Sequence, residues 1–411
     1  MKILQINKFF YKKGGAEQHY FDLMKLLEDH GQEVVQFSMQ SRQNEKSKFA
    51  KFFVSHMDIH NSDQLDFIQK IKNAGRIFYS FEAKRKLEKL LKKHPIDIAH
   101  IHNIYHHISP SILSVLKKHN IPVVMTIHDY KLFSPEYKFY HHGKARQEQA
   151  QGWYLNCIKT KCVNDSLSQS IFLTLEMIFH HKIMRYYERY VDFFIAPSEY
   201  VRSIFLKYGW TEDKIKVLPN FLSSDLPRVD KVIRPPKEPH FVYVGRLSEE
   251  KGVEKLVKYW YDNQLSYPLD IYGSGHLEKR IRILIKTNPN IPVNIVGFVP
   301  REKLLNALKD VTAVVIPSLM PEPFGLTAIE AFAIGIPVVV SGSGALSGMV
   351  EKSQAGVIFD LEKKGSLERA LQVVGDTEFR NHAVEYMKKN HDPEQYYLNL
   401  YNMYENLIKK N

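Results

Sequence analysis

Cysteine is scarce in this chain of 411 residues, which contains only Cys157 and Cys162. Two cysteines exclude a small fold that depends on a framework of disulfides, and they fit a reducing compartment. Because the pair is separated by four residues and no second pair lies nearby, a structural zinc site is a poor interpretation. The sequence gives no role for the segment NCIKTKC that contains them.

Long apolar runs are also absent. The most apolar stretch, residues 171–179, includes Glu176 and is far shorter than the roughly 20 residues that a membrane-spanning helix needs. The first residues, MKILQINKFF, have neither the apolar core nor the cleavage site of a secretory signal. We therefore expect a cytoplasmic protein, either free or at the inner face of the cytoplasmic membrane.

Two missing motifs limit the chemistry. The chain has no G-x-G-x-x-G, and the segment EVVQFSMQ ends without the acidic residue that would bind the ribose of NAD. It also has no D-x-D, so we expect no carboxylate-held metal ion and no cofactor. The segment HIHNIYHH lacks the carboxylates of a metal site, so its histidines are expected to line a polar acceptor pocket or to be structural; they are His100, His102, His106 and His107.

What is present is an ordinary globular composition with a basic first half. Hydrophobic residues make up 44% and charged residues 25%, and the length predicts two or three domains. Residues 1–200 contain 29 Lys and Arg against 20 Asp and Glu, a surplus of +9, which leaves +3 of the net +12 for the rest. Such a surplus suits an anionic membrane surface, phosphorylated substrates or nucleic acid.

Short β-branched segments alternate with helical patterns along the chain, which predicts an α/β fold with parallel sheets. One series runs from ILQIN to KIKVLP and a second from FVYVG to GVIF, and the segment 221–240 between them reads as a linker. We predict two Rossmann-like domains, 1–222 and 223–392. Because open parallel sheets bind ligands at the carboxyl ends of their strands, we expect the two domains to share a ligand in a cleft.

A basic amphipathic pattern occupies residues 68–94. Six cations crowd its second half, which is either a solvated helix face or, over residues 84–93, a surface that docks on anionic lipid headgroups; they are Lys84, Arg85, Lys86, Lys89, Lys92 and Lys93.

The most specific segment is EPFGLTAIEAFAIGIPVV, residues 322–339. A helix that begins near Leu326 would direct the backbone N–H groups of Phe324, Gly325 and Leu326 at an anion. Glu330 would lie among apolar neighbours and needs hydrogen-bond donors, which ribose hydroxyls would supply. Glu322, before the helix, would accept from hydroxyls of another sugar ring. The alternative is a core carboxylate bonded to the main chain and a surface glutamate.

A second candidate is YVGRLSEEKG, where Arg246 and Lys251 follow the strand FVYVG. Arginine can grip a phosphate with two hydrogen bonds and lysine adds a mobile charge, so the pair suits a departing pyrophosphate. The alternative is ion pairing with Glu249 or Glu250.

In the first half, Gly14 and Gly15 lie in the turn between the first strand and its helix, where glycine lets the backbone approach a ligand. The alternative is a simple turn. His128 closes the strand PVVMTIHD, at the edge where this fold binds ligands, and can donate to a sugar hydroxyl or a phosphate. It can also be purely structural.

The order KGGAEQ, TIHDY, APSEY, VLPN, GRLSEEKG, YGSG and EPFGLTAIEAFAIGIPVV resembles glycosyltransferase family 4 over nearly the whole chain. The resemblance implies a GT-B architecture, a nucleotide-sugar donor and retention of anomeric configuration without metal. It also implies that the last helix, within 393–411, crosses back to the first domain. Bacterial surface-polysaccharide members often carry further cysteines after HDY, where this chain has Arg146 and Gln149.

Carried over by motif, the resemblance makes Glu322 the holder of the donor sugar and Glu330 that of the nucleotide ribose. Arg246 and Lys251 would form the diphosphate clamp, and His128 would stand beside the reacting sugar. Gly14, Gly15, Phe324, Gly325 and Leu326 would complete the donor site through their backbone.

We therefore expect an enzyme that moves a sugar, by default from a UDP-sugar, to a saccharide or lipid-linked acceptor in surface polysaccharide synthesis. No nucleic acid partner is expected, because basic and aromatic residues are not interleaved as in RNA-binding modules. A basic polyanion-binding protein without catalysis and a UDP-sugar epimerase remain the alternatives.

Overall fold

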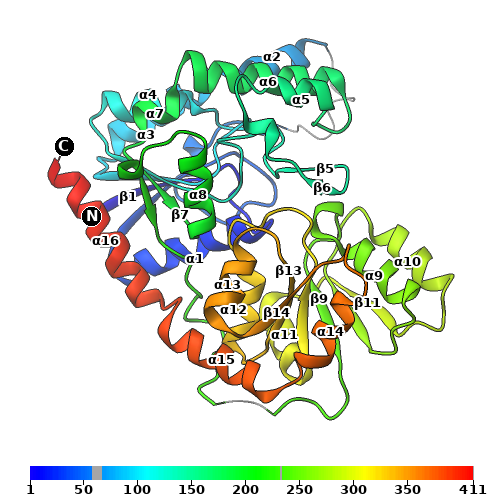
Figure 1. Cartoon of the computed structure of the whole chain (residues 1–411). Helices are drawn as coiled ribbons and strands as arrows, with labels where there is room; N and C mark the ends of the chain where they lie inside the picture. The colour runs from blue at the N-terminus through cyan, green and yellow to red at the C-terminus, as the bar shows by residue number, and fades with distance from the viewer. Residues whose placement is uncertain (58–66, 232–233, 411) are drawn as a thin grey trace. The chain divides into compact units, whose positions relative to one another are not determined.

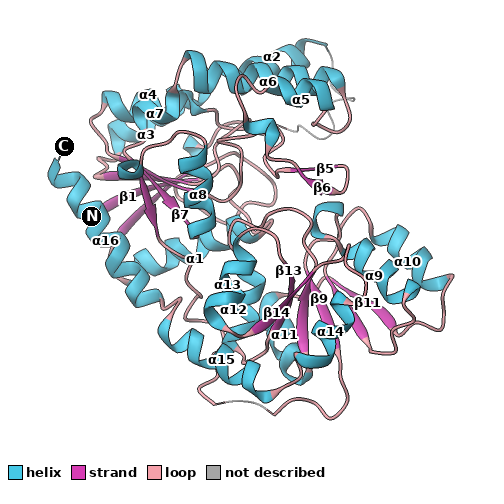
Figure 2. Cartoon of the chain, in the orientation of Figure 1, coloured by secondary structure: helices cyan, strands magenta, loops and turns pink. Residues whose placement is uncertain are grey.

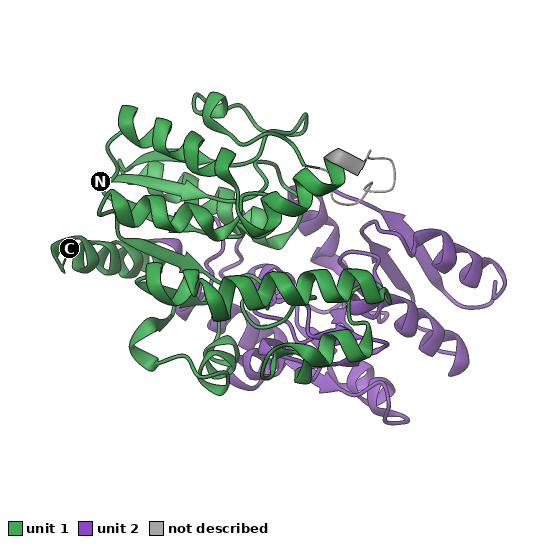
Figure 3. Ribbon diagram, turned by 90° about the horizontal axis from the view of Figure 1, so that it is seen from above, with its two compact units in different colours: residues 1–137, 147–219, 394–411 green, residues 138–146, 220–393 purple. Residues whose placement is uncertain are grey.

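The computed structural model describes residues 1–57, 67–231 and 234–410. The chain forms two compact units, which Figure 3 colours separately. Unit 1 comprises residues 1–137, 147–219 and 394–411, and unit 2 comprises 138–146 and 220–393. The change of unit after residue 219 lies three residues before the end predicted for the first domain. The short excursion of 138–146 into unit 2 has no signal in the sequence.

Unit 1 contains a parallel sheet of six strands in the order β2-β1-β3-β4-β7-β8 (Figure 2). Its strands are β1 (Lys2–Ile6), β2 (Glu33–Phe37), β3 (Ile98–Ile101), β4 (Val123–Thr126), β7 (Phe193–Ala196) and β8 (Ile215–Val217). Every position of β3, β4 and β7 is buried, as expected of parallel strands with helices on both faces.

The helices of unit 1 are α1 (Gly15–Asp29), α2 (Phe67–Phe78), α3 (Phe81–Lys93), α4 (Leu113–Lys118), α5 (Leu155–Thr160), α6 (Leu167–Met177), α7 (Tyr186–Tyr190), α8 (Glu199–Lys207) and α16 (Pro393–Lys410) (Figure 1). A turn of π-helix, η5 (Ile178–Ile183), extends α6. The single helix pattern predicted over 68–94 is in fact two helices, because Ser80 accepts a hydrogen bond from the N–H of Ala83 and begins α3.

Unit 2 contains a second parallel sheet of six strands in the order β11-β10-β9-β12-β13-β14. Its strands are β9 (Phe241–Val244), β10 (Leu269–Tyr272), β11 (Val293–Gly297), β12 (Ala313–Ile316), β13 (Val338–Ser341) and β14 (Gly356–Phe359). Its helices are α9 (Val253–Asp262), α10 (Glu278–Lys286), α11 (Arg301–Ala307), α12 (Leu326–Ala333), α13 (Ala345–Ser353), α14 (Ser366–Val373) and α15 (Thr377–Lys389). The hairpin of β5 (Tyr140–His141) and β6 (Lys144–Ala145) also belongs to unit 2.

Two cores fill the two faces of the sheet in unit 2. On β9, Val242 packs in the core that contains α11, α12 and α15, while Phe241 and Tyr243 pack in the core that contains α9 and α14. Alternate residues of a strand point to opposite faces, so β9 contributes to both cores. The predicted α/β class with two Rossmann-like units is confirmed.

The last helix, α16, packs within unit 1. The hydroxyl of Tyr404 bonds to Nδ1 of His100 on β3 at 2.5 Å, and Tyr397 stacks on His30 with ring centroids 3.7 Å apart. Residues 394–411 thus complete the first unit although they come last in the chain.

Cys157 and Cys162 form a disulfide with their Cα atoms 4.8 Å apart. Helix α5 ends at Thr160, and Lys161 adopts a left-handed conformation with φ of 50°, which turns the chain back so that the two sulfurs meet. Among the described residues, no helix is both long and apolar enough to cross a bilayer.

Candidate active site

In unit 2 the predicted residues Lys251 and Glu322 are in direct contact. The ammonium of Lys251 lies 2.6 Å from Oε1 of Glu322, and Glu322 is 8% exposed. Lys251 belongs to the loop after β9 and Glu322 to the loop after β12. Because β9 and β12 are neighbours at the point where the strand order 3-2-1-4-5-6 reverses, their carboxyl ends form the crevice in which such sheets bind ligands.

Glycine backbones let these two loops come together. Gly252 has φ of 73°, and a Cβ there would lie 2.0 Å from the carbonyl oxygen of Pro317, just after β12. Gly344 has φ of 72°, and a Cβ there would lie 2.3 Å from the backbone nitrogen of Glu322. The N–H of Ala345 also donates to the carbonyl of Glu322 at 2.8 Å. The position of Glu322 therefore depends on two glycines far from it in the sequence.

Ser318 is a further residue of this site that the sequence analysis did not identify. Its hydroxyl donates to Oε1 of Glu322 at 2.5 Å, and the hydroxyl of Ser341 donates to the carbonyl of Ser318 at 2.6 Å. Glu322 is thus held from two directions, by a cation and by a hydroxyl. A serine two residues after a strand is too common for the sequence to single it out.

The helix α12 begins at Leu326, as predicted, with Gly325 at its N-cap. Gly325 has φ of 111°, and a Cβ there would lie 2.5 Å from the side chain of Leu346, so only glycine fits. The first N–H groups of a helix have no partner within the helix and favour an anion. Phe324, Gly325 and Leu326 therefore lie at a suitable helix start, directly after Glu322.

The hydrogen-bond partner of Glu330 differs from the one that the sequence led us to expect. It lies in α12 with its side chain 14% exposed, and Nε of Arg301 in α11 donates to its Oε1 at 2.6 Å. The sequence led us to expect ribose hydroxyls or a main-chain group as the donor. Arg301 has no signal in the sequence, because 29 residues separate the pair.

Arg246 lies exposed on the same loop as Lys251. The N–H of Gly245 donates to Tyr272 and that of Leu247 to Ser274, so the loops after β9 and β10 are joined through their backbones. Arg246 and Lys251 were expected to serve one diphosphate together, and both belong to this loop. What joins them is the loop, whose backbone is fixed on both sides.

The alternative for Arg246 and Lys251 was ion pairing with Glu249 or Glu250, but Lys251 pairs with Glu322. Glu250 is 3% exposed, accepts from the hydroxyl of Ser248 at 2.8 Å and pairs with Lys138 at 3.3 Å. Although burial alone would raise it, the pKa of Glu250 is lowered by the Lys138 ammonium and the Ser248 hydroxyl. Glu250 thus has other partners, and the ion-pair partner of Lys251 is Glu322.

In unit 1, α1 begins at Gly15 and Gly14 is its extended N-cap. A Cβ on Gly14 would lie 3.7 Å from Oε2 of Glu17, an ordinary contact. Glu17 is buried, and burial raises its pKa. Lys8, on the same β1–α1 connection, lies 3.7 Å from the ring centroid of Tyr105, and burial lowers its pKa to about 8. The turn of Gly14 and Gly15 thus lies next to two charged side chains, Lys8 and Glu17, whose pKa values are shifted by burial.

The rings of His100, His102 and His128 stack in a row at the carboxyl ends of β3 and β4, and we call this row the histidine column. His128 is its outermost member. Its Nε2 lies 2.8 Å from Nδ1 of His102, and the two rings stack with centroids 5.1 Å apart. His102 contacts Gln5 at 2.9 Å, and His100 contacts Thr126 at 2.7 Å. Burial lowers the pKa of His100 and of His128 to about 3. Both rings are therefore neutral at physiological pH, and hydrogen bonding rather than charge is what His128 offers.

Some histidines of HIHNIYHH have structural contacts, which is one of the two roles expected for them. His100 and His102 are fully buried and bonded within the fold. Nε2 of His106 lies 3.2 Å from Oε2 of Glu176. A small hollow at the carboxyl ends of β3 and β4 has room for about one water molecule, and none of the four histidines of HIHNIYHH lines it. Its polar lining comprises Asn103, Tyr105, Thr126, His128, Asp129, Lys131 and Tyr187.

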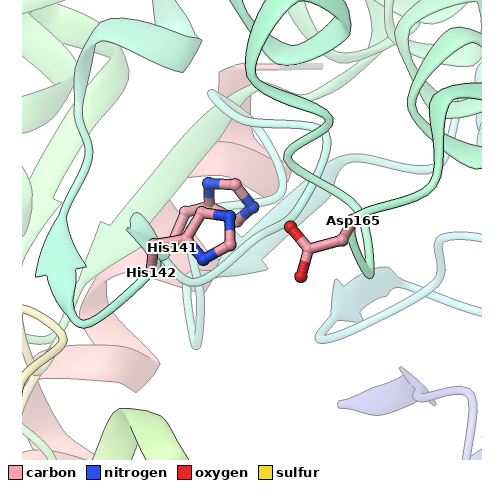
Figure 4. A group of neighbouring side chains, drawn as sticks. All are labelled: His141, His142 and Asp165. Atoms are coloured by element: carbon pink, nitrogen blue, oxygen red, sulfur yellow. The ribbon is translucent and has the colours of Figure 1, made fainter.

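The hairpin of unit 2 carries two further histidines, His141 and His142, whose ring centroids lie 4.0 Å apart (Figure 4). Asp165, also drawn there, belongs to unit 1. Imidazole nitrogens are good ligands for transition metals, but a zinc site needs three or four protein ligands. Two rings on one hairpin do not supply them.

Comparison with known proteins identifies both halves of the chain. Residues 13–226 match the model described as Glycosyltransferase Family 4, and residues 228–390 match that of Glycosyl transferases group 1. An uncharacterized glycosyltransferase of Methanocaldococcus jannaschii is 32% identical over 37% of this chain and 40% of its own length. An uncharacterized 42.6 kDa protein in the cps region of Klebsiella pneumoniae is 22% identical over 84% of this chain and 87% of its own.

Solved structures share the fold. The sucrose-phosphate synthase of Thermosynechococcus elongatus superposes with a TM-score of 0.70 at 18% identity, and the match covers both chains completely. The Anabaena protein HepE in complex with UDP and glucose gives a TM-score of 0.63 at 16% identity over 98% of this chain and 99% of its own. The predicted GT-B fold is confirmed. Of the alternatives that the sequence left open, the family match supports the glycosyl-transferring enzyme. The chain belongs to glycosyltransferase family 4 and transfers a glycosyl group.

Proposed function

We propose that this glycosyltransferase uses a UDP-sugar, retains the configuration at the anomeric carbon and needs no metal ion. The observation that carries the proposal is the Lys251–Glu322 contact beside the start of α12. A cation, a carboxylate and helix-end N–H groups together suit a sugar diphosphate, whose hydroxyls need an acceptor and whose phosphates need donors. The UDP bound by the Anabaena neighbour supports the choice of nucleotide.

In this mechanism the acceptor hydroxyl attacks the anomeric carbon on the face that the diphosphate leaves. Arg246, Lys251 and the backbone N–H groups of residues 324–326 stabilise the charge that builds up on the diphosphate. A phosphate oxygen takes the proton of the acceptor hydroxyl, so no protein nucleophile is required. Glu322 orients the sugar through its hydroxyls, and Glu330 orients the ribose. His128, neutral because its pKa is about 3, gives or accepts a hydrogen bond without carrying charge.

Lys251 has a second role before the donor arrives. Because it pairs with Glu322, the carboxylate is held in place while the site is empty. The diphosphate then competes with Glu322 for the ammonium. The pair thus links binding of the phosphates to release of Glu322 toward the sugar hydroxyls.

We further propose that the acceptor is a saccharide or a lipid-linked saccharide in surface polysaccharide synthesis, used in the cytoplasm at the inner face of the membrane. The similarity to a protein of a capsule region supports this, as do the basic residues of 84–93, which would approach anionic lipid. The contacts of α3 weaken the second argument. Lys84 lies at the hydroxyl of Tyr79 at 2.5 Å and Lys86 pairs with Glu82 at 3.2 Å, so Arg85, Lys89, Lys92 and Lys93 provide the exposed charge.

Product analysis tests the proposal. The purified protein is incubated with UDP-glucose, UDP-galactose or UDP-N-acetylglucosamine, with and without a saccharide acceptor and with EDTA, and the anomeric configuration of the product is read by NMR. We expect an α-linked product from an α-linked donor, formed only with acceptor and unaffected by EDTA. An inverted product, or loss of activity in EDTA, contradicts the mechanism. Epimerised donor without transfer would instead identify an epimerase.

A further inference from the structure

Helix α6 of unit 1 exposes apolar side chains and buries polar ones. Leu167, Ile171 and Leu175 recur at every fourth position, so they form one stripe, and they are 49%, 38% and 51% exposed. The side chains that α6 buries include polar ones: Ser170, Thr174 and Glu176 are each 0% exposed, as is Met177, and Glu176 lies on the far side of the helix from the stripe. A surface helix normally does the reverse.

The buried face fixes this orientation. Oε2 of Glu176 lies 2.7 Å from the ammonium of Lys131 and 3.2 Å from His106, and Oε1 lies 3.6 Å from His180. Lys131 is itself only 4% exposed. If α6 rotated to bury its leucines, Glu176 would leave Lys131 as an unpaired buried cation, which is strongly unfavourable. The apolar stripe is therefore held on the outside by the polar contacts behind it.

Two elements next to α6 in the chain also expose a large apolar side chain. Ile183, at the end of η5, is 60% exposed, and Leu155 of α5 is 53% exposed. Helix α5 lies beside α6 in Figure 1, and the N–H of Val163 in the connection between them donates to Ser170. We name the exposed side chains of Leu167, Ile171, Leu175 and Ile183 the α6 face.

The charge around the α6 face is positive. Between α5 and α7 the exposed cations are Lys159, Lys161, Lys182 and Arg185, against the single exposed carboxylate of Asp165. Glu176, the acidic residue within α6, is turned inward. An apolar stripe bordered by lysine and arginine matches a bilayer with anionic headgroups, in which the aliphatic side chains enter the boundary region and the cations meet the headgroups.

We propose that the α6 face docks unit 1 on an anionic membrane surface. It differs from helix α3, which carries the basic segment 84–93: there Leu87, Leu90 and Leu91 are buried and Phe81, at the start of the helix, is the exposed large apolar residue. That segment contributes charge, whereas the α6 face contributes the apolar area that makes attachment persist at physiological salt. The proposal concerns attachment and stands independently of the donor and the acceptor.

Flotation with vesicles tests the proposal on the full-length protein. Vesicles of phosphatidylglycerol and phosphatidylethanolamine are compared with vesicles of phosphatidylcholine alone. We expect the protein to float with the anionic vesicles, and the variant Ile171→Glu/Leu175→Glu to lose about tenfold or more of this binding at 150 mM salt. The matched control is Ile283→Glu in unit 2, which changes an isoleucine that is 64% exposed on α10. This control should bind like the unchanged protein.

Two readouts keep the result interpretable. The melting temperature and the circular dichroism spectrum must be the same in both variants and in the unchanged protein, which shows that the fold is intact. The proposal is overturned if Ile171→Glu/Leu175→Glu floats as well as the unchanged protein, or if the unchanged protein fails to float. It is also overturned if light scattering shows a dimer that this variant dissociates, since the face would then contact a second copy.

Discussion

The two units have the same number of parallel strands but hold their functional side chains in opposite ways. In unit 2 the site consists of charged pairs on short loops, Lys251 with Glu322 and Arg301 with Glu330. In unit 1 the corresponding edge of the sheet carries neutral, buried histidines, of which His128 is the outermost. The diphosphate proposed to bind unit 2 needs charge that can exchange partners, whereas the histidine column needs only a fixed position.

The order of the strands also differs between the two sheets. Unit 2 has the order 3-2-1-4-5-6, which places the loops after β9 and β12 at the crevice. Unit 1 has the order 2-1-3-4-5-6, which places the loop after β1 beside the loop after β3. The glycine loop of 14–15 and the histidines of β3 are therefore neighbours for a topological reason.

The sharpest test of the charged site replaces Glu322. We expect Glu322→Gln to lower kcat about 100-fold or more, because the carboxylate that we propose to hold the sugar beside the diphosphate is lost. Initial rates at saturating donor measure the effect, and Glu302→Gln, a change on α11 outside the site, is the control. An unchanged kcat in a protein that still binds UDP would remove Glu322 from the mechanism.

The second test addresses the loop that positions Glu322. Gly344→Ala places a Cβ 2.3 Å from the backbone nitrogen of Glu322 at a φ of 72°, so the loop must move. We expect a loss of roughly 2–3 kcal/mol in the free energy of unfolding, together with a large loss of activity. Gly348→Ala, in α13 with nothing within 4 Å of the added Cβ, is the matched control and should be neutral or slightly stabilising. Equal behaviour of the two variants would contradict the argument.

Acid should destabilise unit 1 before unit 2. His100 and His128 have folded-state pKa values of about 3, below the value of about 6.5 in the unfolded chain. The unfolded state thus binds more protons between these values, so the free energy of unfolding falls as pH falls below about 6.5, by up to about 1.4 kcal/mol per pH unit for each histidine. In unit 2, burial lowers the pKa of His391 to about 4, so between pH 7.5 and 5.5 it acts as one such histidine against these two of unit 1. Hydrogen exchange at pH 7.5 and 5.5 should show loss of protection first in β3 and β4; earlier loss in β9 and β12 would reverse the comparison.

The smallest expected effect concerns Arg301. In Arg301→Met, Glu330 keeps its place in α12 but loses its donor, so UDP binding should weaken by about fivefold while kcat at saturating donor stays the same. Calorimetric titration with UDP gives the dissociation constant. Arg282→Met, on α10, is the control. A loss confined to kcat would mean that Arg301 acts on the reacting groups and not through Glu330.

Much of this architecture could be predicted because it depends on local patterns. Buried parallel strands read as apolar runs, and the helix start at Leu326 follows from Pro323 and Gly325. What could not be predicted depends on contacts between distant residues. Ser318 and Arg301 reach the two glutamates only because β12 and α11 lie where the sheet places them, and the disulfide depends on a left-handed Lys161. Single residues of common types carry no pattern for such contacts.

The division of unit 1 into three segments has a consequence for synthesis on the ribosome. Its last segment, residues 394–411, supplies Tyr404 to His100 and Tyr397 to the end of α1. These residues leave the ribosome after all of unit 2 has been made. The half that is translated first is therefore finished last, and a polypeptide released early would carry an open groove where α16 belongs.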